Sequence, residues 1–414
     1  MRSLLLDDAS PSSTTGRGLG GSNAVGAGTE TAYIPTSGSK LDTPAELMLR
    51  RSLFPNAPTV ERLLTWRPGV NLSFALLTSS GNHLPNSKTH QAQALRELRS
   101  SIEENTRQNY GSGIGIFLAF AFDHGLAVAD IFPVSEGVLL AFVGSCCGVR
   151  SARTVKNYLS ALSCWHRMWG QQWRIFPMVT QTLKGVAKLA PQKKPLRLPI
   201  DTIDLLAVRA FLQPTTNSFH AAVWACALLS FFGVCRLSEN TSPSAKFVDP
   251  SRHVTKDRIE PFREVAGVLA VEVRLPWTKT THTDGGRKVL STADGLLDPI
   301  HALRWHLTFN TVASAIPSTT TLFAYRVKAG RGWRLVPLTK KTFLDAFSAA
   351  LRAAGRPTFP GHSFRIGGAC FYWHRGATIP ELKLLGNWAS DSFKVYLRDP
   401  LSGLVPVQQR LLQM

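Results

Sequence analysis

The sequence predicts a mainly α-helical protein with one small antiparallel β-sheet, arranged as a helical domain followed by a mixed α/β domain. Apolar residues recur at helical spacing in most segments after residue 96, whereas a single stretch, 265–275, alternates as a strand does. A basic, proline-containing segment over 184–200 separates the two groups of elements and is predicted to be a linker. The chain has 414 residues, a length that suits two or three domains, each with its own core.

The first 95 residues carry little periodic signal. Residues 1–45 are rich in Ser, Gly and Thr, which predicts disorder. Residues 46–95 form an N-terminal arm of uncertain role. The whole stretch 1–95 could be an arm, a partner-binding segment or wrongly assigned coding sequence.

A helical domain is predicted over 96–190. Ile114, Phe117 and Leu118 place an apolar face on its first helix, and Val155, Tyr158 and Leu162 do the same for a later one. That later helix is predicted over 154–169, and two others over 134–143 and 179–189.

A second domain is predicted over 200–400. Its one hairpin consists of the strand 265–275, a turn at Asp284-Gly285-Gly286 and a return strand near 288–290. The tail 401–414, weakly helical at 407–412, would pack on its own domain or dock on a neighbouring copy. The predicted helices cover 205–212, 221–232, 301–308, 341–354, 364–374 and 380–388.

Basic residues exceed acidic ones, 47 Lys and Arg against 27 Asp and Glu, which gives a net charge of +20. Such a balance indicates a polyanionic partner such as nucleic acid, or less often an anionic membrane surface. No Asp or Glu occurs between Gly137 and Ile200, a stretch that carries ten basic residues. Because a solvated face normally mixes signs, this stretch predicts a surface that contacts phosphates. The candidate contacts are Arg150, Arg153, Lys156, Lys184, Lys188, Lys193, Lys194 and Arg197.

Membrane insertion and metal binding are both disfavoured. The longest apolar run, 221–235, is shorter than the roughly 20 residues that span a bilayer, so a buried helix is predicted there. The six cysteines show neither CxxC spacing nor a Cys/His metal pattern, and most lie among apolar residues. We therefore expect reduced, buried thiols in an intracellular protein, with no disulfide scaffold and no metal site.

Three motifs of the second domain carry polar residues in unusual places. Arg236 ends a buried apolar helix, where Glu239 can hold it by pairing. Lys279 lies near the tip of the predicted hairpin. His362 and Arg365 are three residues apart at the start of a helix and therefore share one face.

The third motif continues toward the C-terminus. Thr378 and Glu381 form a capping-box pattern that opens the next helix, which is predicted to end near Trp388. Tyr396 follows eight residues later, close enough to fold back onto the same cleft.

In this order the motifs resemble those of the tyrosine recombinases, the phage-integrase-like family of enzymes that break and rejoin DNA. The resemblance covers about residues 95–400, since 105–110 and 153–162 resemble the SAM-like, core-binding helices of that family. The stretch from Gly386 to Tyr396 is most similar to eukaryotic mobile-element recombinases of the Crypton and DIRS type. These share the eight-residue step from Trp388, one shorter than is usual in phage and bacterial members.

The resemblance implies a site-specific recombinase or integrase that works through a 3′-phosphotyrosyl intermediate and needs no metal, ATP or other cofactor. Tyr396 would be the nucleophile. Arg236 and Arg365 would stabilise charge on the nonbridging phosphate oxygens, and Glu239 would support them.

Proton transfer falls to other residues in this scheme. His362 would act as a proton shuttle or hydrogen-bond donor, and Trp388 would offer its indole N–H to the phosphate. Lys279 would protonate the departing 5′-hydroxyl, with Lys288 on the same hairpin as the alternative. Tyr372 is a minor rival for the nucleophile, because its place within a helix favours packing.

By resemblance the partner is double-stranded DNA, on which the protein would act as a tetramer at two synapsed sites, in the nucleus if it is eukaryotic. One alternative is a catalytically silent, domesticated DNA-binding protein. Another is a type IB topoisomerase-like enzyme that relaxes supercoiled DNA. The intact motif set argues against the first, and the core-binding-type helices argue against the second.

Overall fold

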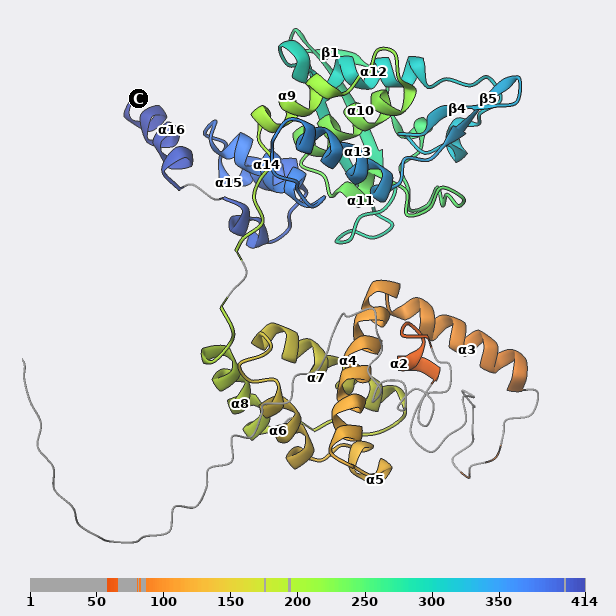
Figure 1. Ribbon diagram of the computed structural model, residues 1–414, viewed down its shortest axis with the longest axis vertical. Coiled ribbons are helices and arrows are strands. Elements are labelled where there is room, and N and C mark those ends of the chain that lie inside the picture. Colours follow the sequence, from red (N-terminus) through yellow and green to blue (C-terminus); the bar gives the residue numbers. More distant parts are fainter. Residues whose placement is uncertain are drawn as a thin grey trace, which may run out of the picture. The chain divides into compact units, whose positions relative to one another are not determined.

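A computed structural model describes residues 58–65, 80, 82, 87–174, 176–192, 195–397 and 400–413. The chain divides into two units, unit 1 up to Lys194 and unit 2 from Pro195 onward (Figure 1). The segment 1–45, most of the arm over 46–95, and Lys193 and Lys194 lie outside the described residues. No helix within the described ranges is long and apolar enough to cross a membrane.

Unit 1 is helical throughout its described part. Its core gathers the apolar faces predicted from the sequence, with Phe117 of α4 against Phe142 of α6 at 5.3 Å between ring centroids. Ser135 and Ser151 begin two of the helices by accepting a hydrogen bond from the backbone N–H three residues on. The helices are α2 (Arg62–Thr65), α3 (Ser87–Ser101), α4 (Glu104–Asp123), α5 (Val128–Ile131), α6 (Glu136–Ser145), α7 (Ala152–Met168) and α8 (Pro177–Lys188).

Unit 2 contains eight α-helices and two antiparallel sheets among its described residues. One sheet has the strand order β1–β2–β3, and the other is the hairpin β4–β5. The helices are α9 (Thr202–Phe211), α10 (Ser218–Phe232), α11 (Leu237–Asn240), α12 (Pro299–Phe309), α13 (Lys340–Ala353), α14 (Ser363–Trp373), α15 (Ile379–Gly386) and α16 (Pro400–Leu412). The strands are β1 (Arg263–Val265), β2 (Val268–Leu275), β3 (Gly286–Ser291), β4 (Tyr325–Ala329) and β5 (Gly332–Val336), and short 3₁₀ helices include η2 (Gly295–Leu297) and η4 (Asp391–Tyr396).

The predicted fold class, mainly helical with a small antiparallel sheet, is confirmed. The hairpin over 265–290 corresponds to β2 and β3, which pair from Ala270 with Ser291 to Leu275 with Gly286. The structure adds β1 and the hairpin β4–β5, which the sequence pattern does not reveal. Their strands are short and mostly exposed, so no regular apolar alternation marks them.

The C-terminal tail differs from the prediction in the length of its helix. α16 begins seven residues before the predicted helix at 407–412, and Arg410 donates to the Gly376 carbonyl of the same chain at 3.1 Å. This contact corresponds to the first alternative for the tail, packing on its own domain.

All six cysteines are free thiols, and four of them are buried.

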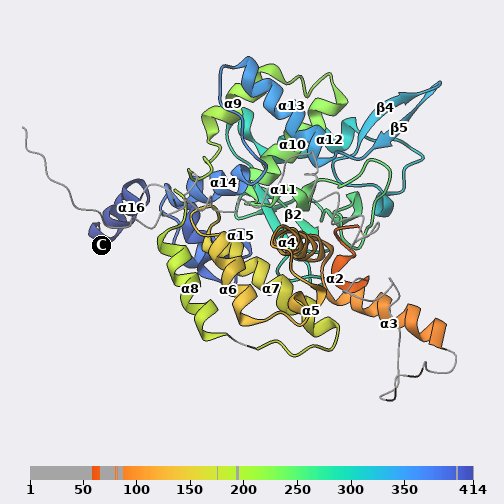
Figure 2. The same cartoon turned by 60° about the horizontal axis from the view of Figure 1, so that its bottom comes forward.

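The helix α10 is the centre of unit 2, and α14 packs closely against it (Figures 1 and 2). Every residue of α10 from Ala221 to Phe232 is buried, as the long apolar run predicts. The close approach of α14 depends on two glycines. A Cβ on Gly367 would lie 2.0 Å from the Ile200 carbonyl oxygen, and one on Gly368 would lie 2.0 Å from that of Phe231. This contact brings the start of α14 to the end of α10.

Candidate active site

The chain leaves α10 through a strained turn that presents Arg236. Val234 has a φ of 49°, a left-handed conformation that costs a β-branched residue about 1 to 3 kcal/mol. Arg236 then precedes α11, and Glu239 holds it twice. One carboxylate oxygen accepts from the Arg236 backbone N–H and the other from its Nη1, both at 2.8 Å. The predicted pairing of Arg236 with Glu239 is therefore confirmed.

Arg365 is 1% exposed and is fixed by backbone carbonyls instead of a carboxylate. Its Nη1 donates to the Val234 carbonyl at 2.5 Å and its Nη2 to the Gly386 carbonyl at 2.8 Å. The guanidinium lies 4.3 Å from the ring centroid of Trp388. Two of its five N–H donors are thus engaged, and Nε is buried without a hydrogen-bond partner. Burial, followed by the charge of Arg236, lowers the pKa of Arg365.

Trp388 follows α15 after a left-handed residue, Asn387, which has a φ of 53°. The predicted helix end at 388 is thus two residues late, because α15 stops at Gly386. The predicted capping box does open this helix, since Thr378 and Glu381 bond each other reciprocally. Trp388 lies under the Arg365 guanidinium, and its indole N–H forms no hydrogen bond within the described residues. Packing and phosphate binding are both open to it.

His362 and Tyr396 meet across the site. The distance from His362 Nε2 to the Tyr396 hydroxyl oxygen is 2.8 Å. Burial, reinforced by the positive charges of Arg365, Arg197 and Arg236, lowers the pKa of His362 to about 4. The imidazole is therefore neutral near pH 7. In the tautomer protonated on Nδ1, its Nε2 accepts the hydrogen bond from Tyr396.

The short helix η4 holds Tyr396 in this place. Phe393 is fully buried and stacks on Trp388 at 5.0 Å between ring centroids. Asp391 pairs with Lys383 and with Lys394, each at 2.7 Å, and these two cations lower its pKa to about 2. The nucleophile candidate is thus anchored by the residues that precede it in η4, in keeping with its predicted return to the site.

The two candidate lysines lie in different environments. Lys288 on β3 is 3% exposed, and its Nζ donates to the Leu385 carbonyl at 2.8 Å. Burial lowers its pKa, and the neighbouring Arg365 and Arg236 add to that effect. Lys279, in the loop between β2 and β3, is exposed and has no hydrogen bond or carboxylate within the described part of the chain. Of these two candidate lysines, Lys279 is the one whose Nζ is free within the described residues.

Tyr372, the minor rival nucleophile, faces away from this chemistry. Its hydroxyl donates to the Phe232 carbonyl at 3.0 Å, and burial raises its pKa to about 12. The expectation that it packs within the helix is confirmed.

The sequence reasoning missed the two backbone carbonyls that hold Arg365. One belongs to the turn after α10 and the other to the last residue of α15, so no side-chain motif predicts them. The nearest signals in the sequence were two glycines, Gly233 directly before Val234 and Gly386 itself. The described residues hold no group of three or more His, Cys, Asp or Glu side chains that could bind a metal. What the cluster offers is two forked cations, a hydroxyl and a neutral imidazole.

Four of the basic candidates in unit 1 lie on the helices α7 and α8. Arg153 and Lys156 on α7, and Lys184 and Lys188 on α8, are exposed, whereas Arg150 is half-buried. A hollow of about 440 Å³ between α7 and α8 is bordered by Lys156, with further cations nearby. These additional lining cations are Arg167 and Arg174. Arg197 belongs to unit 2, where it is exposed and near enough to lower the pKa of His362.

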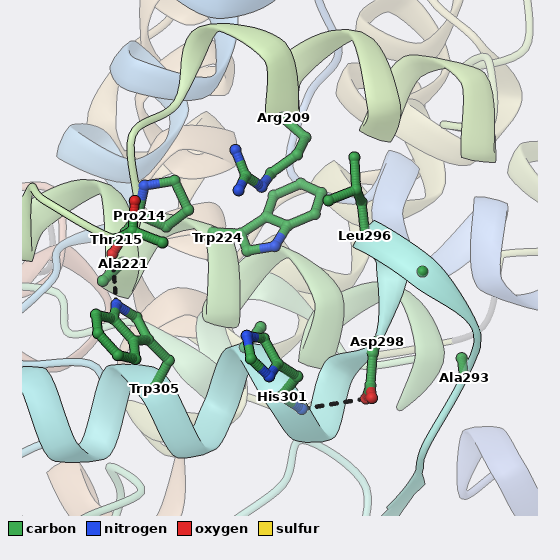
Figure 3. A pocket seen from close by; sticks show the side chains of 12 residues that line it. Arg209, Pro214, Thr215, Ala221, Trp224, Ala293, Leu296, Asp298, His301 and Trp305 are labelled. Atoms are coloured by element: carbon green, nitrogen blue, oxygen red, sulfur yellow. Dashed lines mark hydrogen bonds between the residues drawn. The ribbon is translucent and has the colours of Figure 1, made fainter.

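A separate cavity of about 290 Å³ opens at the other end of α10 (Figure 3). Trp224 and Trp305 form its walls, with Arg209 above and His301 below in the figure. The Trp305 N–H donates to the Pro214 carbonyl at 2.7 Å. None of the residues predicted for catalysis lines this cavity, so it is distinct from the cluster of Arg236, Arg365, His362 and Tyr396.

Sequence comparison finds no matching family model and no matching curated protein. Solved structures with a similar chain path include the XerH site-specific recombinase bound to a palindromic difH substrate (13% identity, 90% of this chain and 98% of that one, TM-score 0.49). A lambda integrase dimer bound to a COC′ core site is 16% identical over 76% of this chain and 96% of that one, with a TM-score of 0.44. At identities below 25% and TM-scores below 0.5, these similarities carry no conclusion about the activity of this chain.

Proposed function

We propose that this protein breaks and rejoins DNA strands as a tyrosine recombinase. The observation that carries the proposal is the hydrogen bond between the Tyr396 hydroxyl and a neutral His362, beside two immobilised guanidinium groups. A hydroxyl next to a base and a set of fixed cations is the arrangement that nucleophilic attack on a phosphodiester requires.

In the proposed step the Tyr396 oxygen attacks the phosphorus while its proton passes to His362 Nε2. The bond from phosphorus to the 5′-oxygen breaks, and a 3′-phosphotyrosyl bond forms. Arg365 and Arg236 donate to the nonbridging oxygens, where charge develops. Because the new bond keeps the energy of the old one, the reverse attack by a 5′-hydroxyl rejoins the strand without ATP. The step needs no metal ion.

The departing 5′-oxygen needs a proton, and the two lysines suit different tasks. Lys279 has a free Nζ on an exposed loop, so we assign the proton transfer to it. The Nζ of Lys288 is bound to the Leu385 carbonyl, one residue before the carbonyl that holds Arg365. Lys288 is therefore assigned as a positioning residue that acts through the end of α15.

The same proposal extends to the substrate, the DNA contacts, the assembly and the location of the protein. Duplex DNA is the substrate, and the exposed cations of α7, α8 and the segment over 184–200 contact its phosphates. Action at specific sites and assembly of a tetramer on two synapsed sites follow from the resemblance to the tyrosine recombinase family. Kinship with Crypton and DIRS mobile elements follows from the Gly386–Tyr396 stretch, and the location would be nuclear if the protein is eukaryotic. Phosphate contacts of this kind would make the affinity fall steeply with salt.

Trapping on a nicked suicide substrate tests the activity. Binding sites are first enriched from a random pool of DNA duplexes. A nick is then placed close to each phosphodiester in turn, so that cleavage releases a short fragment that diffuses away and cannot be rejoined. We expect wild-type protein to form a denaturant-resistant adduct joined through Tyr396. The variant Tyr396→Phe should bind equally well and form none, while Tyr372→Phe, the matched control, should form the adduct.

Two outcomes would replace the proposal. Binding without any adduct would identify a silent DNA-binding protein. Relaxation of supercoiled plasmid by a monomer, without sequence preference, would identify a topoisomerase-like enzyme.

A further inference from the structure

The hairpin β4–β5 carries the most one-sided charge of unit 2. From Pro299 to Leu344 the sequence contains no Asp or Glu and seven Lys or Arg. Four of these seven, Arg326, Lys328, Arg331 and Arg334, lie on the hairpin. Within the described residues none of the four has a carboxylate within salt-bridge distance, whereas Arg274 and Arg287 of the other sheet pair with Glu260 and Glu272.

The base of the hairpin is fixed to the body of unit 2. The Arg326 N–H donates to Asn310 Oδ1 at 2.9 Å, and Ser218 Oγ donates to the Arg326 carbonyl at 2.8 Å. The Arg326 guanidinium lies between two rings, 4.3 Å from the centroid of Phe309 and 4.9 Å from that of Trp333. These contacts keep the hairpin at a constant direction, and it stands out from the body in both overall views (Figures 1 and 2).

The tip of the hairpin is a tight turn. Ala329 pairs with Gly332, which leaves Gly330 and Arg331 as a two-residue loop. Gly330 has a φ of 58° and Arg331 does not have positive φ, so the loop is of type II′, which suits the twist of the strands. Arg331 is therefore presented at the end of a short, rigid ribbon.

Lys328 and Arg334 lie on opposite faces of the β4–β5 hairpin. Lys328 is paired with Trp333, so these two share one face, while Arg334 is paired with Val327 on the other. Side chains on a strand alternate between faces, and paired residues point the same way. The major groove of B-DNA is about 12 Å wide, admits a two-stranded ribbon and has phosphates along both walls. A ribbon with a cation on each face and one at its tip matches that groove.

We propose that the β4–β5 hairpin is a second DNA-binding element, which enters the major groove and contacts phosphates on both walls through Lys328, Arg331 and Arg334. The proposal rests on the proposed function for the identity of the polyanion. The base of the hairpin meets the N-terminal end of α10, and Arg236 follows the C-terminal end. The 15 residues of α10 separate the two by about 22 Å, or roughly six base pairs of DNA.

The test compares two triple variants that remove the same charge. Lys328→Ala, Arg331→Ala and Arg334→Ala together remove the unpaired cations of the hairpin. Arg274→Ala, Arg287→Ala and Lys341→Ala together remove cations that already have carboxylate partners. We expect the hairpin variant to lower the slope of log affinity against log salt by up to about 3, since each lost phosphate contact accounts for about 0.9, and the control to change it little.

Entry of the hairpin into the major groove is measured separately, by methylation of guanine N7 with dimethyl sulfate, because N7 lies in that groove. Wild-type protein should protect guanines roughly six or more base pairs from the cleaved phosphodiester, and the hairpin variant should leave them reactive. Trapping of the Tyr396 adduct at saturating protein should be unchanged, which separates this test from that of the activity. Arg331→Gln alone, at the exposed tip, should lower the slope by about 0.9 without affecting folding.

An unchanged salt slope in a folded hairpin variant would overturn the proposal, and unchanged N7 protection would overturn the placement in the groove. Loss of the adduct at saturating protein would also count against it, because the hairpin would then act on the chemistry itself.

Discussion

The two ends of α10 use positive charge in opposite ways. At the C-terminal end, Arg236 is held by Glu239, and Arg365 is buried between two carbonyls and the ring of Trp388. At the N-terminal end, Lys328, Arg331 and Arg334 stand exposed without carboxylate partners among the described residues.

The two environments allow different uses of positive charge. A buried guanidinium in fixed geometry has already lost its water and its freedom, so its attraction for a phosphate is strong and directed. An exposed cation is screened by salt and moves freely, so it contributes affinity and little direction. We therefore expect catalysis to depend on the shape of the cations at one end and binding to depend on their number at the other.

Exchange of Arg for Lys should have the largest and most unequal effects at the two ends of α10. Arg365→Lys keeps the charge and removes the fork, so the cleavage rate should fall by about 10²- to 10³-fold, as measured by single-turnover adduct formation. Arg331→Lys keeps a point charge at the hairpin tip and should leave both the cleavage rate and the salt slope unchanged. Similar losses at both positions would contradict the distinction.

The two lysines of the β2–β3 hairpin should also respond differently to substitution. Lys279→Met should slow cleavage by about 10²- to 10⁴-fold, because the departing oxygen loses its proton donor. A substrate with sulfur in place of the 5′-bridging oxygen needs no such proton, so it should restore the rate. Lys288→Met should slow both substrates alike, since it disturbs the end of α15 that holds Arg365. The reverse pattern of rescue would exchange the two assignments.

Two histidines give a smaller effect, on stability. Burial lowers the pKa of His306, near the N-terminal end of α10, and of His362, at the other end, from the unfolded value of 6.5 to about 4. Between pH 6.5 and 4 the unfolded chain binds protons that the folded chain does not, so the free energy of unfolding should fall as the pH falls. For the fully buried His306 the loss reaches about 3 kcal/mol.

Urea unfolding at several pH values measures this loss. His306→Gln should flatten the dependence of unfolding free energy on pH. Under the proposed function, bound DNA should raise the pKa of His362 by placing a phosphate beside it and leave that of His306 unchanged. Equal shifts of both, measured by NMR titration, would argue against a phosphate at the Tyr396 end.

Much of the fold was predictable because most helices bury one face. α4, α7 and α10 follow directly from their apolar spacing or continuous apolar run. The hairpin β4–β5 was not predictable, since its strands expose charged residues at positions where alternation would need apolar ones. The side chains of the site were found by motif, as were the pairing of Arg236 with Glu239 and the return of Tyr396. The environments of Lys279 and Lys288 could not be predicted, because sequence spacing does not tell which side of a strand meets the core.

The sequence alone determined the fold class, the excess of positive charge and the set of side chains that resembles a recombinase site. These depend on local periodicity and on residue type, which every segment carries by itself. Only the tertiary structure decided that Val234 and Gly386 present carbonyls to Arg365, that His362 is neutral beside Tyr396, and that one lysine is buried while the other is free. These depend on burial and on contacts between segments up to 131 residues apart, where packing sets both the dielectric surroundings and the partners of each charge.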